Sequence, residues 1–382
     1  MKLILMLLDN EYAPDLRVKK EINTLIQSGF GIDLFCWDRE GKLKSKDLSY
    51  NFNIIRIITI SKRQMGYKQL INLIRFYYLL YKEVVVKGKQ YSVIHAHDLR
   101  TLLIAVILRF KLKIPLVYDA HEIFSLMESH KFSRIVLSII AKLEIILVNK
   151  FVDKFITVSN QRKKAYWKKN GISQKIHIVG NWYNPISSYT LMEKKKIKTK
   201  LNIPEGKPIM AYLGSVHPGR DVESFCKYLE KEPTIHGIIA GNGSEVTIQK
   251  IKKYSELNEN ISYLGFIADT DSIYQISDIL VYLVDSKHNY SHWIAPNNLF
   301  IAIAYRKPLI AIDRGEVSEI FSQNSIGSLV SDYSFNSLKE GVDNILKIDN
   351  LREIDENLKL CQREYSWYNA EKELKTLYSE LF

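Results

Sequence analysis

Short runs of consecutive apolar residues alternate along the whole chain with longer stretches of helical period. Runs such as 279–284 and 308–312 are apolar throughout, which is typical of parallel strands covered by helices on both faces. The alternation predicts an α/β protein. In the first half we expect strands at 2–8, 31–37, 54–58, 92–96, 115–119, 154–158 and 176–179, and in the second half at 209–213, 235–240, 262–264, 279–284, 308–312 and 327–330.

The chain length predicts more than one domain. It has 382 residues, whereas single hydrophobic cores stop growing at about 250 to 300 residues. Residues 186–207 show little apolar periodicity, carry a lysine cluster and end in Pro-Glu-Gly, which predicts a linker. We therefore expect two doubly wound, Rossmann-like domains facing a cleft, at 1–185 and 208–365, with ligand sites at the carboxyl ends of the strands.

Composition adds an uneven distribution of charge. A chain that is 46% hydrophobic and 25% charged is neither disordered nor of low complexity. Its net charge is +12, yet residues 1–190 hold 31 Lys and Arg against 15 Asp and Glu, while the rest hold 23 against 27. A cation-rich half favours contact with a polyanion, such as a membrane surface, nucleic acid or a phosphorylated substrate.

Cysteine use and hydropathy suggest a cytoplasmic protein. The scattered residues Cys36, Cys226 and Cys361 have no C-x-x-C spacing and fit a reducing compartment. The first residues predict a buried strand rather than a signal peptide, because no small-residue cleavage pattern follows them. No run of 18 uncharged apolar residues occurs, so we expect no transmembrane helix.

Residues 61–90 concentrate the positive charge. They hold seven Lys or Arg against Glu83 alone, around an aliphatic and aromatic interior. A basic amphipathic helix of this kind is typical of a peripheral contact with an anionic membrane. A helix packed on the sheet with a solvated basic face has the same pattern, and the charge asymmetry favours the membrane. Nucleic acid is disfavoured, because the aromatic residues lie within the apolar stripe.

Three segments of the second half have features of anion sites. Residues 211–221 run from a strand through Gly214 to Arg220 and into a helix, a pattern that suits a phosphate or an ordinary turn. The G-x-G of Gly241 and Gly243 lacks the third glycine of a dinucleotide fingerprint. Residues 296–297 precede an apolar helix, whose free N–H groups could hold a diphosphate or simply be capped.

Two strand ends of the first half place histidine beside a carboxylate. His95 and His97 lie two apart on one strand, and Asp119 and His121 repeat the spacing on another. Zinc needs three or four convergent ligands, and the spacing does not show convergence, so we expect no metal. Buried histidines with satisfied hydrogen bonds, sugar binding and proton transfer all remain open.

In this order, the segments resemble the retaining glycosyltransferases of the GT-B fold, specifically family 4 (glycosyl transferases group 1), which transfer sugars from nucleotide donors. The likeness covers essentially the whole chain. PDLRVKKEINTLIQSGFGIDLFCWDRE, YSVIHAHDLRTLLIAVIL and IPLVYDAHEIF resemble the first domain. MAYLGSVHPGRDVE, IIAGNG and IAPNNLFIAIAYRKPLIA resemble the donor half. Residues of about 366–382 resemble the terminal helix that packs back on the first domain.

The resemblance implies roles for individual residues. A UDP- or GDP-linked sugar is the donor, bound through backbone groups of 262–267 for the base, and neither a metal nor another cofactor takes part. His121, Asp119 and Glu122 would lie at the reacting sugar, and Asp15, Arg17 and His97 would line the acceptor side. The residues assigned to the donor are Gly214, Ser215, Arg220, Gly241, Gly243, Pro296, Asn297, Asn298, Leu299, Glu316 and Glu319.

The chain departs from the family pattern at the donor site. Many members carry a Glu, which binds the donor ribose, where this chain has Ile301, and some carry another at Trp293. Ser215 and Asn298 replace a second phosphate Arg and a Lys. A lost charged hydrogen bond costs roughly 1.5 to 3 kcal/mol. Glu316 or Glu319 could substitute, or the donor is atypical, or the activity is lost.

The sequence therefore predicts a hexosyltransferase-type enzyme of cell-surface polysaccharide biosynthesis. We expect it to be cytoplasmic and peripheral on the inner face of the cell membrane, and to transfer a sugar with retention to a lipid-linked or glycan acceptor. The alternatives are a catalytically silent GT-B homologue that serves as a binding or scaffold partner, and a GT-B sugar-nucleotide epimerase. Nucleic-acid binding is the least favoured hypothesis.

Overall fold

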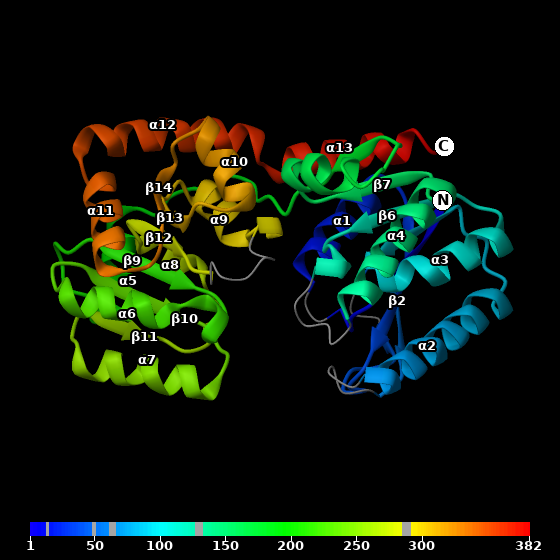
Figure 1. Cartoon of the computed structure of the whole chain (residues 1–382), viewed down its shortest axis with the longest axis horizontal. Coiled ribbons are helices and arrows are strands. Elements are labelled where there is room, and N and C mark those ends of the chain that lie inside the picture. The colour runs from blue at the N-terminus through cyan, green and yellow to red at the C-terminus, as the bar shows by residue number, and fades with distance from the viewer. Residues whose placement is uncertain (13–14, 48–50, 61–65, 127–132, 285–291) are drawn as a thin grey trace. The chain divides into compact units, whose positions relative to one another are not determined.

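The computed structural model describes residues 1–12, 15–47, 51–60, 66–126, 133–284 and 292–382. The chain divides into two compact units: unit 1 comprises residues 1–180 and 370–382, and unit 2 comprises residues 181–369 (Figure 1). Each unit contains one sheet flanked by helices, so the α/β class predicted from the sequence is confirmed.

The sheet of unit 1 has the strand order β3-β4-β2-β1-β5-β6-β7-β8. All neighbouring pairs are parallel except β3 with β4. The seven strands expected in this half are present, and the short β3 was not predicted because two polar residues carry no apolar pattern. The strands are β1 (Leu3–Leu8), β2 (Gly31–Asp38), β3 (Lys46–Asp47), β4 (Asn53–Ile58), β5 (Val93–His97), β6 (Leu116–Ala120), β7 (Lys154–Thr157) and β8 (Ile176–Ile178).

Most helices of unit 1 connect successive strands, and the inner strands β1, β5 and β6 are buried because helices cover the sheet. The order of the strands reverses between β1 and β5, which makes their carboxyl ends the switch point of the sheet. The helices are α1 (Leu16–Gln27), α2 (Gly66–Val86), α3 (Asp98–Leu112), α4 (Arg134–Phe151), the 3-10 helix η1 (Phe124–Leu126), the π-helix η2 (Arg162–Lys168) and α13 (Trp367–Ser379).

The sheet of unit 2 is wholly parallel, with the order β11-β10-β9-β12-β13-β14, and its switch point lies between β9 and β12. All six expected strands are present. The strands are β9 (Ile209–Leu213), β10 (His236–Ala240), β11 (Ile261–Tyr263), β12 (Ile279–Tyr282), β13 (Leu309–Ile312) and β14 (Gly327–Val330). The helices are α5 (Leu191–Lys200), η3 (Pro218–Arg220), α6 (Val222–Lys231), α7 (Glu245–Leu257), α8 (Asp271–Ile276), α9 (Asn297–Tyr305), α10 (Gly315–Gln323), α11 (Phe335–Ile345) and α12 (Ile348–Glu364).

The segment expected as a linker, 186–207, contains helix α5 and is part of unit 2. Thr190 caps this helix, accepting from the backbone N–H of Glu193 while the Glu193 carboxylate accepts from that of Thr190. No side chain of α5 is buried. Lysine and glutamate have a high helix propensity, so this segment forms a helix although it has no apolar stripe. Apolar periodicity alone therefore could not reveal the helix.

The last residues of the chain, 370–382, belong to unit 1. The Tyr378 hydroxyl lies 2.8 Å from His95 Nδ1 on β5, and Glu373 lies 2.7 Å from His177 Nδ1 on β8. These contacts fix α13 on the same sheet as the N-terminal strands. Among the helices that the structure describes, none is long and apolar enough to cross a bilayer.

Candidate functional site

A buried polar cluster lies at the carboxyl end of β6 in unit 1. The Arg17 guanidinium, from the first turn of α1, donates to both carboxylate oxygens of Asp119, at 2.8 Å each. It also donates to the carbonyl of Val179 and lies 3.1 Å from Glu21. Arg17 and Asp119 are both buried, so this pair ties α1 to β6 and to the segment after β8. Arg17 therefore positions Asp119.

His121 follows β6 and is the partly exposed member of this cluster. Its Nε2 lies 2.9 Å from Asp119 Oδ2 and 3.0 Å from His97 Nδ1. The side chain of His121 is 14% exposed, whereas those of Asp119 and His97 are fully buried. Of these three residues, His121 is the one that a small molecule can reach, and the buried His97 contacts it from the inner side of the cluster.

The charges in the cluster are set by burial and by neighbouring ions. Burial opposes ionisation of His121, but the carboxylates of Asp119 and Asp98 outweigh it and raise its pKa to about 9. Burial would raise the pKa of Asp119, yet Arg17 and His121 hold it well below its usual range. Burial lowers the pKa of His97. At neutral pH the accessible imidazole is thus a cation beside a carboxylate.

Asp98, which the sequence analysis left out of the candidate set, holds the loop that carries His121. Its carboxylate accepts from the backbone N–H groups of His121, at 2.9 Å, and Glu122, at 3.1 Å. Asp98 has a left-handed backbone with φ of 61°, an uncommon conformation outside glycine and a frequent mark of functional sites. Burial raises the pKa of Asp98 to about 7.

Arg162 is a second residue that sequence reasoning missed. It lies at the start of the π-helix after β7, donates to the carbonyl of His121 and lies 3.3 Å from the Glu122 carboxylate. Single turns of π-helix occur frequently at functional sites, but they have no signature in a sequence. Asp15, which was expected on the acceptor side, caps α1 by accepting from the backbone N–H of Val18 at 3.1 Å.

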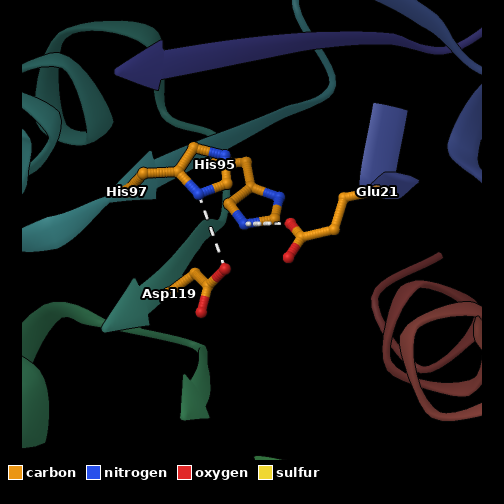
Figure 2. A group of neighbouring side chains, drawn as sticks. All are labelled: Glu21, His95, His97 and Asp119. Atoms are coloured by element: carbon orange, nitrogen blue, oxygen red, sulfur yellow. Dashed lines mark ion pairs between the residues drawn. The ribbon is translucent and has the colours of Figure 1, made fainter. Parts of the chain in front are cut away.

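Figure 2 shows the inner part of the cluster, where Glu21, His95, His97 and Asp119 offer metal-ligand atoms within 4.8 Å of one another. This convergence could not be predicted from the spacing of the residues along the chain. The charge balance does not suit a divalent metal, because the Arg17 guanidinium already contacts both carboxylates and the His121 imidazolium contacts Asp119. A dication would add uncompensated positive charge in a buried place. The ion pairs of Asp119 with Arg17 and His121 are the centre of the group.

A pocket of about 410 Å³ opens at the carboxyl ends of β9 and β10 in unit 2. Glycine backbone forms one wall, and apolar side chains form the other, with Phe266 largely exposed. A partly apolar pocket with exposed backbone groups suits a planar aromatic base. Its lining residues are Leu213, Gly214, Ser215, Ala240, Gly241, Asn242, Phe266, Ile267, Thr270 and Tyr274.

The G-x-G glycines let two loops pack backbone against backbone. A Cβ on Gly241 would lie 1.7 Å from the carbonyl oxygen of Gly214, and one on Gly243 would lie 1.9 Å from that of Val216. Gly241 also has φ of 146°, which L side chains rarely adopt. These glycines therefore shape the pocket wall, and Gly241 is itself part of the lining.

Arg220 and α9 lie around the switch point of this sheet. The Arg220 guanidinium is 3.4 Å from the carbonyl oxygen of Leu283, just beyond β12. The Asn298 amide donates to the Leu213 carbonyl at 3.0 Å, which fixes the first turn of α9 at the end of β9. Pro296 precedes α9 and gives no side-chain cap. A cation and a helix N-terminus thus lie where doubly wound sheets bind phosphates.

Comparison with known proteins decides the family. The Glycosyltransferase Family 4 model matches residues 17–185, and the Glycosyl transferases group 1 model matches residues 193–358. The chain is a GT-B glycosyltransferase of family 4. Solved structures agree on the fold: HepE of Anabaena in complex with UDP has a TM-score of 0.72 at 16% identity over 100% of both chains. Sucrose-phosphate synthase of Thermosynechococcus elongatus has 0.73 at 15%, over 100% of this chain and 99% of that one.

A curated relative of this glycosyltransferase is the O-antigen biosynthesis glycosyltransferase WclY of Escherichia coli. It is 26% identical over 211 residues, which are 52% of this chain and 56% of the relative. The match therefore spans little more than half of the curated relative.

Two carboxylates considered for the donor ribose, Glu316 and Glu319, lie in the first turns of α10. Glu316 is buried, and neither is among the described residues that line the pocket. Ile301, on α9, packs against the hydrophobic core of unit 2. Leu299 is also buried in that core, so it can offer a ligand only backbone groups.

Helix α2 (Gly66–Val86) makes up most of the basic segment 61–90 of this glycosyltransferase. Residues 87–90 follow the helix, and residues 61–65, with Lys62 and Arg63 among them, lie outside the described residues. Phe76, Leu80 and Val84 are the buried side of α2. The opposite side exposes apolar as well as basic side chains. Helix α2 therefore packs on unit 1 with an outer face that mixes apolar and basic side chains, and contact with a membrane stays a prediction.

Proposed function

We propose that this glycosyltransferase transfers a sugar from a UDP- or GDP-linked donor to a lipid-linked or glycan acceptor, with retention, in the synthesis of a cell-surface polysaccharide. The observation that carries the proposal is the glycine-walled pocket beside Arg220 and α9 in a group 1 unit. HepE, of the same fold, binds UDP and UDP-glucose. The O-antigen role of WclY supports the polysaccharide context.

Donor binding is proposed for unit 2. The pocket would take the base, and the diphosphate would lie at the switch point between β9 and β12. There Arg220 supplies a cation, and the first turn of α9 supplies N–H groups without a side-chain cap. Both would stabilise the charge that develops on the leaving diphosphate, which is electrostatic catalysis without a metal.

Acceptor binding is proposed for unit 1. The His121 imidazolium, held by Asp119 and by the Asp98-bound loop, is the reachable cation of the cluster. It would donate a hydrogen bond to a hydroxyl of the reacting sugar, while Glu122 approaches the acceptor. Attack by the acceptor hydroxyl on the face that the diphosphate leaves would give retention, with positioning as the main contribution.

A donor screen tests the proposal. Purified protein is incubated with UDP- and GDP-linked sugars and lipid extracts, and products are resolved by mass, with anomeric configuration read by NMR. We expect transfer or slow donor hydrolysis from one nucleotide class, with the anomeric configuration retained. His121→Ala should reduce the rate about a hundredfold or more, whereas His177→Ala, which removes a histidine of unit 1 that pairs with Glu373, is the matched control. Absence of both transfer and hydrolysis would refute it.

Ile301 supports a second candidate, a catalytically silent homologue that acts as a binding partner. Ile301 packs against the core of unit 2 and offers no carboxylate to a ribose. In that case calorimetry would show no nucleotide binding, and the chain would associate tightly with another transferase. Nucleotide binding in the calorimeter would count against this candidate.

A further inference from the structure

Helix α4 of unit 1 is apolar on its exposed side as well as on its inner side, which is unusual for a surface helix. Its buried side includes Glu144, whose carboxylate accepts a 2.5 Å hydrogen bond from Tyr118 on β6. Its outer side carries Ile135, Ile139 and Ile146, which are 74%, 59% and 49% exposed. A solvated helix places its charges outward and its apolar stripe inward. The outer face of α4 is therefore built for an apolar environment.

The exposed apolar residues of α4 form one stripe. Ile135, Val136, Ile139, Leu143 and Ile146 follow a helical spacing of 1, 3 or 4 residues, so they share one side of the helix. The buried Glu144 and Val148 lie on the opposite side. Since Glu144 is bonded to Tyr118, α4 cannot rotate to bury the stripe without exposing that buried pair.

The stripe continues onto the two neighbouring helices. Helix α3 packs against both α4 and α2, and Figure 1 shows these helices on unit 1. Phe110 of α3 is exposed and lies edge-on to Phe151 of α4, with ring centroids 5.4 Å apart. On α2, the exposed side chains include Ile71, Ile74 and Tyr78. Exposed apolar residues that occur on adjacent helices in this number mark an interaction surface.

Basic side chains accompany the apolar ones. Arg134, Lys142 and Lys150 are exposed on α4, whose only acidic residue is the buried Glu144. Lys111 follows Phe110 at the exposed end of α3, and Arg75 and Lys82 are exposed on α2. Apolar side chains flanked by cations, without acidic partners on α4, are complementary to an anionic lipid surface. A hydrophobic protein partner would not require this ring of positive charge.

We infer that the outer face of α4, extended by α3 and α2, is a docking surface for an anionic lipid bilayer. The aliphatic side chains enter the boundary between headgroups and acyl chains, and the lysines and arginines contact lipid phosphates. The inference rests on the proposed function for its purpose, because a lipid-linked acceptor is presented at a membrane. It adds α4 and the end of α3, which the basic segment 61–90 does not include.

Vesicle sedimentation with the full-length chain tests the surface. We expect the protein to sediment with phosphatidylcholine vesicles that contain phosphatidylglycerol, and to bind at least about tenfold more weakly to phosphatidylcholine alone. The double variant Ile139→Ser with Leu143→Ser should lose about tenfold or more in binding to anionic vesicles. Val246→Ser with Leu257→Ser, at exposed apolar positions of α7 in unit 2, is the matched control and should bind as the wild type does.

Charge variants separate the lipid phosphate from the acyl chain. Lys142→Gln with Lys150→Gln should weaken binding to anionic vesicles severalfold, and Lys252→Gln with Lys253→Gln on α7 is the control. Sedimentation velocity in detergent-free buffer checks a second copy of the chain as the occupant. The inference would be overturned if the wild-type chain formed a dimer that Ile139→Ser dissociates, or if the wild-type protein did not bind anionic vesicles. UDP titration of the same variants tests the proposed function separately, because the nucleotide site is proposed for unit 2 and the docking surface for unit 1.

Discussion

The polar cluster of unit 1 and the pocket of unit 2 both lie at carboxyl ends of parallel strands, but they are built from different parts of the chain. In unit 1, charged side chains from distant segments pair with one another, as Arg17 does with Asp119. In unit 2, backbone groups form the wall, and glycine permits their close approach, as at Gly241. The first site depends on balanced charge and the second on the absence of side chains, so different substitutions should break each.

The largest expected effect is on the charge balance of unit 1. Arg17→Met would leave the buried Asp119 carboxylate without its main cation, so we expect a loss of about 3 to 5 kcal/mol in the free energy of unfolding. Arg109→Met, at the half-exposed pair with Asp153, should cost about 1 kcal/mol or less. Urea unfolding measures both. Equal losses in the two variants would show that the cluster is not a special charge network.

Breaking the backbone wall of unit 2 comes next. Gly241→Ala places a Cβ against the Gly214 carbonyl at φ of 146°, and we expect about 2 to 4 kcal/mol of destabilisation with loss of UDP binding. Gly206→Ala has a positive φ but no atom within 4 Å, so it should cost only about 1 kcal/mol and leave UDP binding unchanged. Thermal unfolding and calorimetry check this pair, and similar UDP affinity in both would contradict the role of the wall.

A pH dependence should distinguish the two sites. The folded state raises the pKa of His121 from 6.5 to about 9, so its protonation stabilises the fold fully below pH 6.5, and this stabilisation is lost as pH rises through 9. The loss should be at most about 3 kcal/mol. It appears as the difference between wild type and His121→Gln in unfolding free energy from pH 6 to pH 10. His217→Gln is the control, and parallel curves for wild type and His121→Gln would contradict the pKa.

The smallest expected effect concerns the anchor of α9. Asn298→Ala removes one hydrogen bond to the Leu213 carbonyl and should cost about 1 kcal/mol in stability. It should also weaken UDP binding about three- to tenfold, because the first turn of α9 is no longer fixed at the end of β9. Asn369→Ala, at a surface amide that donates to the Arg363 carbonyl, is the control. An unchanged UDP affinity would remove Asn298 from the site.

The sequence predicted the strands because parallel strands covered by helices are continuous apolar runs. It also indicated the donor half, because the residues of each motif there, such as the one that ends in Arg220, are close together in the sequence. It could not show the network of unit 1, because Arg17 and Asp119 are 102 positions apart, and Tyr378 reaches His95 from 283 positions away. Asp98 was passed over for the same reason, because its carboxylate accepts from backbone N–H groups 23 and 24 positions further along the chain.

The outer face of α4 is a second feature that the sequence alone could not predict. Residues 134–151 are apolar at most positions, so the hydrophobic pattern does not show which side of the helix faces the core. In the structure the apolar stripe faces outward, and Glu144 faces Tyr118. Periodicity gives the existence of two faces, but only the tertiary contacts show which of them is buried.

The pocket and the switch point of unit 2 are proposed to bind a nucleoside diphosphate. Calorimetric titration with UDP and with GDP, on wild type and Arg220→Ala, tests this proposal most directly. We predict one site for one of the two nucleotides, and about tenfold or greater weakening in Arg220→Ala through the lost contact with the diphosphate. Failure of both nucleotides to bind the folded protein, or equal affinity in wild type and Arg220→Ala, would contradict the account.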